Sequence, residues 1–347
     1  LLPFHLDRIN PRSAELKEIR KADLAIDFFQ GVKLALDSLS REGYNFKLQV
    51  FDSQEDELHM VNLARAKSVL SNELIIGPVF PESIKIFSEF ADLQHKLEVS
   101  PLAAADPEQF KNPNLVSITN NIEQHGRKIA EFINSNYKPE NVNLILINTR
   151  SSDDDKFASP FKSFLSELSG KKFVIKERPN SIGLEEDLSQ SKTNLVIIAS
   201  ASRDFVLPTI DLLYKVSQAG SKIEVFGHPY WVKAQFLNAE KMQWLNTRIT
   251  SSFYIDYKSS RVKSFIARYL RDYGTDPSEY AFKGFDSGYY FGKLLALYGN
   301  KYAEHLTEDQ YEGLHNNFRF IKDQKSGFLN TELMILKYQG FELQPEK

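Results

Sequence analysis

The sequence contains no cysteine, which excludes disulfide bonds, thiolate zinc sites and a cysteine nucleophile. It also has no apolar run close to the ~20 residues that a helix needs to cross a bilayer. Neither sign of charge is in large excess, because the sequence has 43 basic and 46 acidic side chains. A nearly neutral chain has no field that attracts DNA, RNA or an anionic membrane. We therefore expect a protein without disulfides, membrane spans or a nucleic-acid partner.

Catalytic and metal-binding motifs are missing as well. The sequence has no Gly-x-Ser-x-Gly elbow, no Walker loop and no glycine fingerprint for a dinucleotide. Its seven histidines lack a metal-binding spacing such as His-Glu-x-x-His. The three aspartates at 153–155 lack the glycine and distal glutamate of a calcium loop and are interpreted as a solvated turn before a helix. These absences predict a protein that is not an enzyme and that holds no cofactor or metal.

What the sequence does contain is an alternation of short apolar strands with amphipathic helices. At 347 residues the chain is too long for one ordinary core and suits two lobes of roughly 150 residues each. The predicted strands are residues 1–4, 47–52, 74–76, 97–99, 141–147, 172–177, 195–199, 223–227 and 249–254. The predicted helices are residues 25–36, 61–70, 157–168, 206–218, 260–273 and 276–298. This alternation predicts an α/β protein with doubly wound parallel sheets covered on both faces by helices.

Two features near the end of the chain carry further predictions. Gly284, Gly288 and Gly292 recur every four residues in the last long helix, which predicts close packing of that helix face against a neighbour. Residues 318–321 and 332–338 are predicted to pair as a hairpin across a glycine-containing turn.

The elements, in this order, resemble the type I periplasmic binding proteins, a group that includes receptors for branched-chain amino acids. The resemblance is carried by residues 29–35, by the loops at 77–78 and 99–103, by the helix at 280–287 and by the C-terminal hairpin. It implies two lobes joined by three crossovers, with a ligand held in the cleft between them and a hinge that closes around it. The expected lobes are residues 1–121 with 257–322, and residues 122–256 with 323–347.

The chain departs from the amino-acid receptors of this group at positions that hold the ligand. Ala103 and Ala104 stand where those receptors carry a hydroxyl for the α-carboxylate. Phe157 stands where a tyrosine is usual, and His228 stands where an acidic residue is expected to hold the α-ammonium. Each buried polar group of a ligand that loses its partner costs on the order of 1–3 kcal/mol. The resemblance therefore implies the fold, while the departures argue against a standard amino acid as ligand.

The residues expected to line the ligand site follow the strands of the predicted sheets, because ligands bind beyond the carboxyl ends of parallel strands. They are Pro78, Phe80, Ser83, Ser100, Ala103 and Ala104 in the first lobe, and Phe157, Ser202, His228, Tyr230 and Trp231 in the second. Backbone N–H groups at the helix start after Pro78 can bind an anion, and the aromatic groups suit sugars, peptides or flat apolar ligands. The alternative for each loop is an ordinary turn or a packed surface.

The leading hypothesis is a non-catalytic solute-binding protein that is periplasmic or anchored in the cell envelope. Its partner would be a small-molecule ligand of unknown class, with the permease of an ABC importer as a second partner. The alternative is an envelope lipoprotein that contacts the cell-wall machinery, in the manner of the lipoproteins of this fold that regulate peptidoglycan synthases, with a vestigial cleft. An effector-binding domain cut from a regulator or receptor is the third class. The sequence begins at Leu1, within an expected strand. Whether a signal peptide, a lipid anchor or an upstream domain has been removed is therefore an open question.

Overall fold

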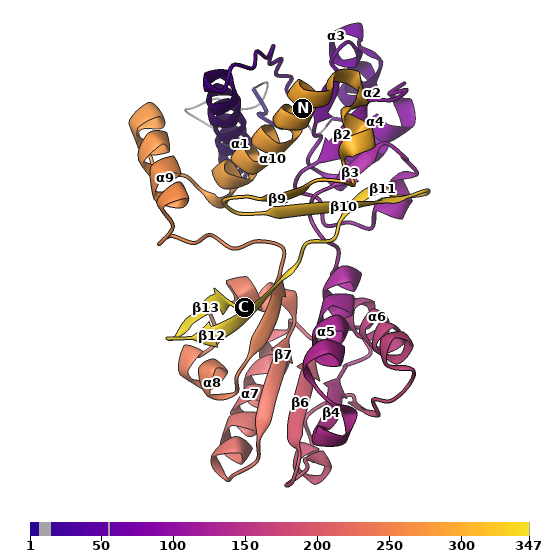
Figure 1. Ribbon diagram of the computed structural model, residues 1–347, viewed down its shortest axis with the longest axis vertical. Helices are drawn as coiled ribbons and strands as arrows, with labels where there is room; N and C mark the ends of the chain where they lie inside the picture. The colour runs from indigo at the N-terminus through magenta and orange to yellow at the C-terminus, as the bar shows by residue number, and fades with distance from the viewer. Residues whose placement is uncertain (7–14, 55, 347) are drawn as a thin grey trace. The chain divides into compact units, whose positions relative to one another are not determined.

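The computed structural model describes residues 1–6, 15–54 and 56–346 and divides the chain into two compact units (Figure 1). Unit 1 consists of Leu1–Asn120 and Phe253–Glu332, and unit 2 of Asn121–Ser252 and Leu333–Lys347. The chain passes between the units after Asn120, Ser252 and Glu332. The last two strands of unit 1 extend through the region of Lys322 and pair within unit 1.

Unit 1 contains a six-stranded sheet in the order β1-β2-β3-β11-β10-β9. Its strands are β1 (Leu74–Ile76), β2 (Leu97–Ser100), β3 (Leu115–Ser117), β9 (Gln310–Glu312), β10 (Asn317–Asp323) and β11 (Gly327–Asn330). Its helices are α1 (Leu16–Arg41), α2 (Glu57–Arg65), α3 (Lys67–Leu70), α4 (Pro81–Phe90), α9 (Ser260–Tyr273) and α10 (Glu279–Tyr298), with 3₁₀ turns η1 (Pro107–Phe110) and η5 (Gly299–His305). The first three strands and β11 run parallel, whereas β10 is antiparallel to both of its neighbours.

Unit 2 contains a seven-stranded sheet in the order β13-β12-β8-β7-β6-β4-β5. Its strands are β4 (Val142–Ile147), β5 (Ile175–Arg178), β6 (Thr193–Ile198), β7 (Ile223–Gly227), β8 (Arg248–Ser251), β12 (Met334–Gln339) and β13 (Glu342–Pro345). Its helices are α5 (Ile122–Asn136), α6 (Ser152–Ser169), α7 (Arg203–Gln218) and α8 (Ala239–Trp244), with 3₁₀ turns η2 (Pro139–Asn141), η3 (Leu184–Asp187) and η4 (Pro229–Lys233). Strands β5, β4, β6, β7 and β8 are parallel, and β12 joins them antiparallel.

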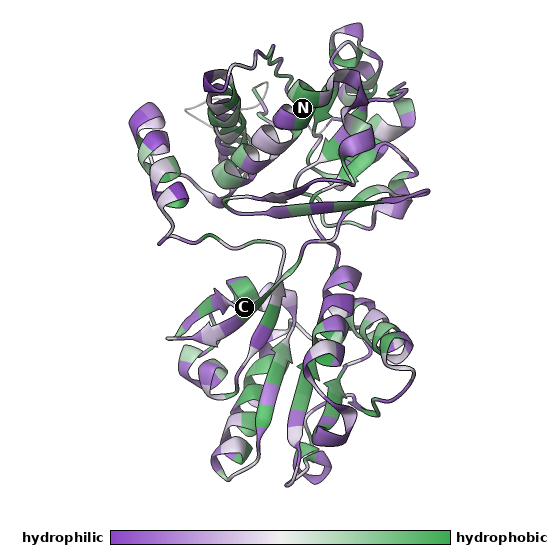
Figure 2. Ribbon diagram, in the orientation of Figure 1, coloured by the Kyte–Doolittle hydropathy of each residue, from purple (hydrophilic) through white to green (hydrophobic). Residues whose placement is uncertain are grey.

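The core of unit 2 lies on both faces of its sheet, which Figure 2 shows as largely hydrophobic strands. Successive side chains of a strand point to opposite faces. Leu144 and Leu146 of β4 accordingly pack in one cluster with α5 and α6, while Ile145 and Ile147 pack in the other with α7 and α8. The near-continuous apolar strands of the sequence thus form a buried parallel sheet, as predicted.

Helices α1 and α10 pack so closely that glycine is required at their contact. A Cβ atom on Gly284 would lie 2.1 Å from the carbonyl oxygen of Phe28, and one on Gly31 would lie 2.0 Å from that of Ala281. Gly288 and Gly292 continue the same contact along α10. The prediction that the glycines of the last long helix serve close packing is confirmed.

Two predicted strands and one predicted hairpin differ from the structure. Residues 1–4 and 47–52 form no regular strands, and only an isolated parallel bridge joins Leu2 to Asp52. The predicted C-terminal hairpin is wrong in its second arm, because β10 pairs with β11. Residues 332–338 instead supply β12, which pairs with β8 and β13 in unit 2. Residues 318–321 and 332–338 show the same alternation of apolar and polar residues. The sequence pattern therefore cannot tell which strand each of them pairs with, and this is decided by the tertiary structure.

Candidate functional site

The carboxyl edge of the unit 2 sheet brings aromatic and polar side chains together after β7. His228 follows β7 directly, and its Nδ1 accepts a hydrogen bond from the backbone N–H of Tyr230 at 3.2 Å, which caps η4. Gly227 is needed before it, because a Cβ atom there would lie 2.2 Å from the ring of Trp231. The sequence Gly-His-Pro-Tyr-Trp therefore folds as a tight turn. The rings of His228 and Trp231 are buried in the unit, whereas the ring of Tyr230 is exposed.

Three of the predicted site residues form an aromatic column from the core to the surface. The His228 ring lies 5.6 Å from the Phe157 ring and 4.8 Å from the Tyr230 ring, the latter edge to face. Phe157 is fully buried, His228 is 5% exposed and Tyr230 is 68% exposed. Only Tyr230 of the three offers a large aromatic surface outside the core of the unit.

Trp231 lies in the core cluster and is 1% exposed. Its indole N–H donates to the backbone carbonyl of Ser200 at 3.0 Å, so the one polar atom of the ring is satisfied inside the unit. In this unit Trp231 is a packing residue that holds the turn of His228 against the loop after β6. Ser202, another predicted site residue, is exposed at the start of α7, where its side chain makes no capping hydrogen bond.

A second histidine, His125 of α5, lies at the same edge. Its Nδ1 is 2.9 Å from Oγ1 of Thr250, and its Nε2 is 3.4 Å from Oγ of Ser252. Burial and, to a lesser extent, the electrostatic effect of His228 lower the pKa of His125 to about 3. Burial likewise lowers the pKa of His228 to about 4. Both imidazoles are therefore neutral at pH 7 and offer hydrogen-bonding groups without charge.

The loop between β4 and α6 places acidic side chains beside this histidine pair. Asp154 is buried and accepts a hydrogen bond from Thr149 at 2.5 Å, while Ser151 caps the helix by accepting from the Asp154 N–H. The charges of Asp154 and Asp153 raise the pKa of His228 against the effect of burial. Because carboxylates already occupy the first turn of α6, the helix start disfavours a bound anion.

The predicted residues of unit 1 lie around the carboxyl ends of β1 and β2. Most are covered: Pro78, Ser83, Ser100 and Ala103 are buried, Phe80 is half-buried before α4, and Ala104 is exposed. The backbone carbonyl of Ser100 accepts from the N–H of Ile118, which joins its loop to the one after β3. In unit 1 the chain presents mainly backbone and small side chains at this edge.

His125, Thr250 and Asn148 also belong to the edge of unit 2 and were not among the residues predicted from the sequence. Asn148 is fully buried, and its amide donates to Asp155 at 2.8 Å and to Glu177 at 3.2 Å, which ties the β4–α6 loop to β5. In the sequence, an asparagine directly after an apolar strand is the signal that marks Asn148. Nothing local marks His125, because its partners come from a strand more than a hundred residues later.

His125 stands between two hydroxyls, as the base of a nucleophilic site would, but a pKa of about 3 makes it too weak a base to activate them near pH 7. Among the described residues, no group of three or more histidine and acidic side chains is placed to hold a metal ion. In the part of the chain that the structure describes, no helix has the length and apolarity of a membrane span.

The fold is that of the type I periplasmic binding proteins, as comparison with solved structures shows. A putative branched-chain amino acid ABC transporter protein from Rhodospirillum rubrum has 16% identity and a TM-score of 0.68, over 94% of this chain and 96% of that chain. An ABC transporter substrate-binding protein from Desulfitobacterium hafniense, in complex with Leu, has 16% identity and a TM-score of 0.57, over 92% and 95%. The predicted fold class is confirmed.

Full-length LpoA from Haemophilus influenzae is also similar, with 13% identity and a TM-score of 0.60. The alignment covers 94% of this chain but 56% of LpoA, so the chain spans little more than half of that protein. No protein-family model matches the sequence, and neither does any curated protein. The similarity is therefore one of fold.

Proposed function

We propose that this chain is a non-catalytic solute-binding protein of the cell envelope whose ligand is a small neutral molecule with a flat or apolar part. The observation that carries the proposal is the edge of unit 2, where two neutral histidines, two hydroxyls and an exposed tyrosine lie at the carboxyl ends of the parallel strands. Ligands of open α/β sheets bind at this end of the strands. Delivery to an ABC importer would match the similar structures from Desulfitobacterium hafniense and Rhodospirillum rubrum, which are described as ABC transporter proteins.

The electrostatics of the edge favour a neutral ligand. The acidic first turn of α6 repels anions, and neutral histidines offer no cation to pair with a carboxylate. Aromatic faces and neutral donors and acceptors together suit sugars, nucleosides or capped peptides. A neutral ligand also agrees with Ala103, Ala104 and His228, which stand where the resemblance to amino-acid receptors implies hydroxyl and acidic groups for the ligand.

A thermal-shift screen against amino acids, short peptides, sugars, nucleosides and muropeptides tests the proposal. A molecule that binds only the folded state stabilises it by about 2.7 kcal/mol at a hundredfold excess over its Kd. We expect a rise in melting temperature with a neutral member of the panel and none with free amino acids. A shift only with anionic ligands would contradict the assignment.

Replacing Tyr230 by alanine tests the site itself. We expect the affinity for the ligand found to fall by about tenfold, because removing an aromatic contact costs on the order of 1 kcal/mol or more. The melting temperature of the ligand-free variant should equal that of the parent protein, since the Tyr230 side chain is 68% exposed. Trp244→Ala is the matched control, because Trp244 is also an exposed aromatic of unit 2, at 54%, but lies on α8. Equal affinity of the Tyr230 variant and the parent would remove this edge from the site.

A second function is an envelope interaction module that contacts cell-wall machinery, and the similarity to LpoA favours it. No shift with any member of the panel, together with capture of a cell-wall protein that resists salt washing, would favour this role over solute binding.

A further inference from the structure

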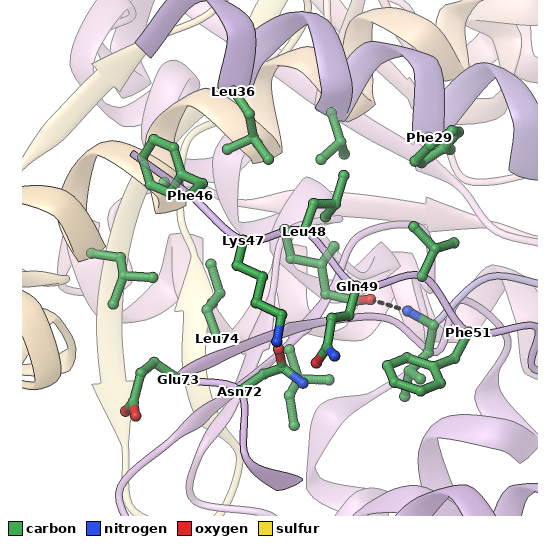
Figure 3. A pocket seen from close by; sticks show the side chains of 18 of the residues that line it. Phe29, Leu36, Phe46, Lys47, Leu48, Gln49, Phe51, Asn72, Glu73 and Leu74 are labelled. Atoms are coloured by element: carbon green, nitrogen blue, oxygen red, sulfur yellow. Dashed lines mark hydrogen bonds between the residues drawn. The ribbon is translucent and has the colours of Figure 1, made fainter. Parts of the chain in front are cut away.

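The outermost strands of the two sheets differ in what lies on their outer side. Strand β1 comes first in the strand order of unit 1, and α1, α10 and the segment 46–51 surround an apolar cavity of about 170 Å³ beside it (Figure 3). The carbonyl of Ile76 in β1 accepts a hydrogen bond from the Leu1 ammonium at 2.7 Å. Strand β5 comes last in the strand order of unit 2, next to β4. The outer side of β5 is the edge considered below.

The backbone groups of β5 alternate between β4 and the outer side. The carbonyl of Arg178 accepts a hydrogen bond from the N–H of Asn148, the residue after β4, at 2.9 Å. Backbone groups of successive residues in a strand point to opposite sides, so those of Ile175 and Glu177 point away from β4. Among the described residues, none forms a hydrogen bond with the outward backbone groups of these two residues. Strand β5 therefore offers two N–H and two C=O groups to an added strand.

Two large apolar side chains flank this edge and are exposed to solvent. Val174, directly before β5, is 81% exposed, and Ile182, in the loop after β5, is 79% exposed. The Arg178 guanidinium donates to the carbonyls of Ile182 and Gly183, which holds this loop on the face of β5 that carries the Arg178 side chain. Val174 is four residues before Arg178, so its side chain lies on the same face. This face presents an apolar group near each end of β5.

The charge of the edge is positive. Lys171, Lys172 and Lys176 are exposed, and within the part of the chain that the structure describes no carboxylate forms an ion pair with them. Glu177, the acidic residue of β5, is already paired with Lys162 at 2.8 Å. Opposite charges on neighbouring strands stabilise a sheet, so a segment with carboxylates opposite the lysines would suit this edge.

A second copy of β5 does not meet this requirement. In a symmetric antiparallel pair, Ile175 would lie opposite Ile175 or Glu177 of the other copy, or the two Glu177 residues would lie opposite each other. The first register places Lys172 opposite Arg178, and the second places Lys176 opposite Lys176. Like charges directly opposite each other destabilise a sheet. Each register brings like charges together, which favours a different, acidic segment.

We propose that β5 is a docking edge for an extended acidic segment of a partner protein, which adds to the sheet of unit 2 as a further strand. The outward backbone groups of Ile175 and Glu177 supply the main-chain hydrogen bonds, as in other complexes formed by strand addition. Apolar side chains of the segment cover Val174 and Ile182, and its carboxylates lie opposite the lysines. The docking edge does not depend on the proposed solute-binding function.

Fluorescence anisotropy with a labelled synthetic peptide tests the docking edge on the full chain. The probe, acetyl-Val-Thr-Glu-Ile-Val-Thr-Asp-Glu-amide, is designed to run antiparallel to β5, with its first glutamate opposite Lys176 and its isoleucine opposite Ile175. In the control peptide, lysine replaces all acidic residues. We expect the acidic peptide to bind at least about tenfold more tightly than the lysine peptide, because like charges across an interface suppress binding.

Backbone methylation separates strand addition from charge attraction alone. N-methyl groups on the second and fourth residues of the acidic peptide remove the donors that face Glu177 and Ile175. N-methyl groups on its third and fifth residues point away from β5 and serve as the control. We expect the first pair to weaken binding by about tenfold or more relative to the second, because it leaves acceptors of β5 unpaired. Equal affinities of the two methylated peptides would overturn the proposal.

Variants of the edge supply the last comparison. Val174→Asp should weaken binding of the acidic peptide by about tenfold, and Lys176→Glu should shift the preference toward the lysine peptide. Leu58→Asp on α2 and Lys222→Glu before β7 are exposed controls that should leave binding unchanged.

The comparison has three outcomes that contradict the docking edge. No binding of the acidic peptide up to about 1 mM, the weak end of specific recognition, would overturn it. An unchanged peptide preference in Lys176→Glu would do the same. A dimer of the parent chain in sedimentation that Val174→Asp abolishes would assign the edge to a second copy in place of an acidic partner.

Discussion

Glu98 shows how a single buried carboxyl group can shape the stability of unit 1. It lies in β2, fully buried, and its Oε2 accepts hydrogen bonds from Ser88 and Asn112, each at 2.8 Å. Its Oε1 is buried without a hydrogen-bond partner. Burial raises the pKa of Glu98 to about 8, against the lowering effect of the two hydrogen bonds. The group is therefore protonated at neutral pH in the folded state and ionised in the unfolded one.

This pKa makes the sign of the pH dependence definite. Between the ordinary pKa of a glutamate and about 8, the folded state binds one proton more than the unfolded state at Glu98. Stability from this group is thus complete in acid and is lost as pH rises toward 8. We expect Glu98→Gln, which imitates the protonated form, to lose less stability than the parent between pH 5 and pH 8. Urea unfolding across this range measures the difference.

The control for this variant is Glu89→Gln, an exposed glutamate of α4. The Leu1 ammonium opposes the trend, because its pKa is lowered to about 5, but it is common to all the proteins and cancels in the comparison. Identical pH slopes for the parent and Glu98→Gln would refute the assignment. At pH 5 the two should lie within about 1 kcal/mol of each other, since the same two hydrogen bonds can form.

At the scale of elements, the contact between α1 and α10 predicts a graded series. A Cβ atom would lie 2.1 Å from a backbone oxygen at Gly284, 3.0 Å from the Cα of Val32 at Gly288, and 2.9 Å from the flexible end of Leu39 at Gly292. Backbone atoms cannot move aside without separating the helices, whereas a side-chain end can. We expect Gly284→Ala to cost about 1–3 kcal/mol or more through overpacking. Gly292→Ala should cost less, because the end of the Leu39 side chain can move aside and the gain of about 1 kcal/mol in helix propensity then offsets the remaining strain.

Thermal or urea unfolding of the three alanine variants checks the series, with Gly292→Ala as the internal control. Similar costs at Gly284 and Gly292 would mean that the helices separate freely and that the close contact is not needed. The four-residue spacing in the sequence indicated this contact, but the partner helix lies some 250 residues earlier in the chain and could not be read from the spacing.

For the molecule as a whole, the two units can be observed separately because both tryptophans, Trp231 and Trp244, lie in unit 2. Tryptophan fluorescence therefore follows the unfolding of unit 2. In that unit the pKa of His125 is lowered to about 3 and that of His228 to about 4, both mainly by burial. The unfolded chain binds protons at these histidines as pH falls below about 6.5, and the folded unit does not.

Unit 2 should therefore lose stability as pH falls from 6.5 to 5, by about 3 kcal/mol if both histidines contribute. The urea midpoint seen by fluorescence measures this loss. His228→Gln should show a smaller loss than the parent, while His305→Gln, in unit 1, should leave the fluorescence transition unchanged. A midpoint that rises on acidification would contradict the neutral state of the histidine pair.

Local sequence patterns were sufficient to predict the strand–helix alternation, the buried parallel strands of unit 2 and the glycine face of α10. The fold class follows from these features. Each of these depends on residue types repeated at short spacing, which burial on one or two faces imposes directly. Packing in space decided the rest. Residues 332–338 alternate equally well for either sheet, and their place beside β8 depends on the other strands present.

The same limit applies to the candidate site. Tyr230 and Trp231 are adjacent and both aromatic, yet one is 68% exposed and the other 1% exposed, because the turn of η4 directs them oppositely. His125 meets Thr250 only when α5 packs beside β8. Spacing along the chain predicts which face of an element is apolar. Which distant side chains meet, and which histidines lose their charge through burial, is decided only when the elements pack together.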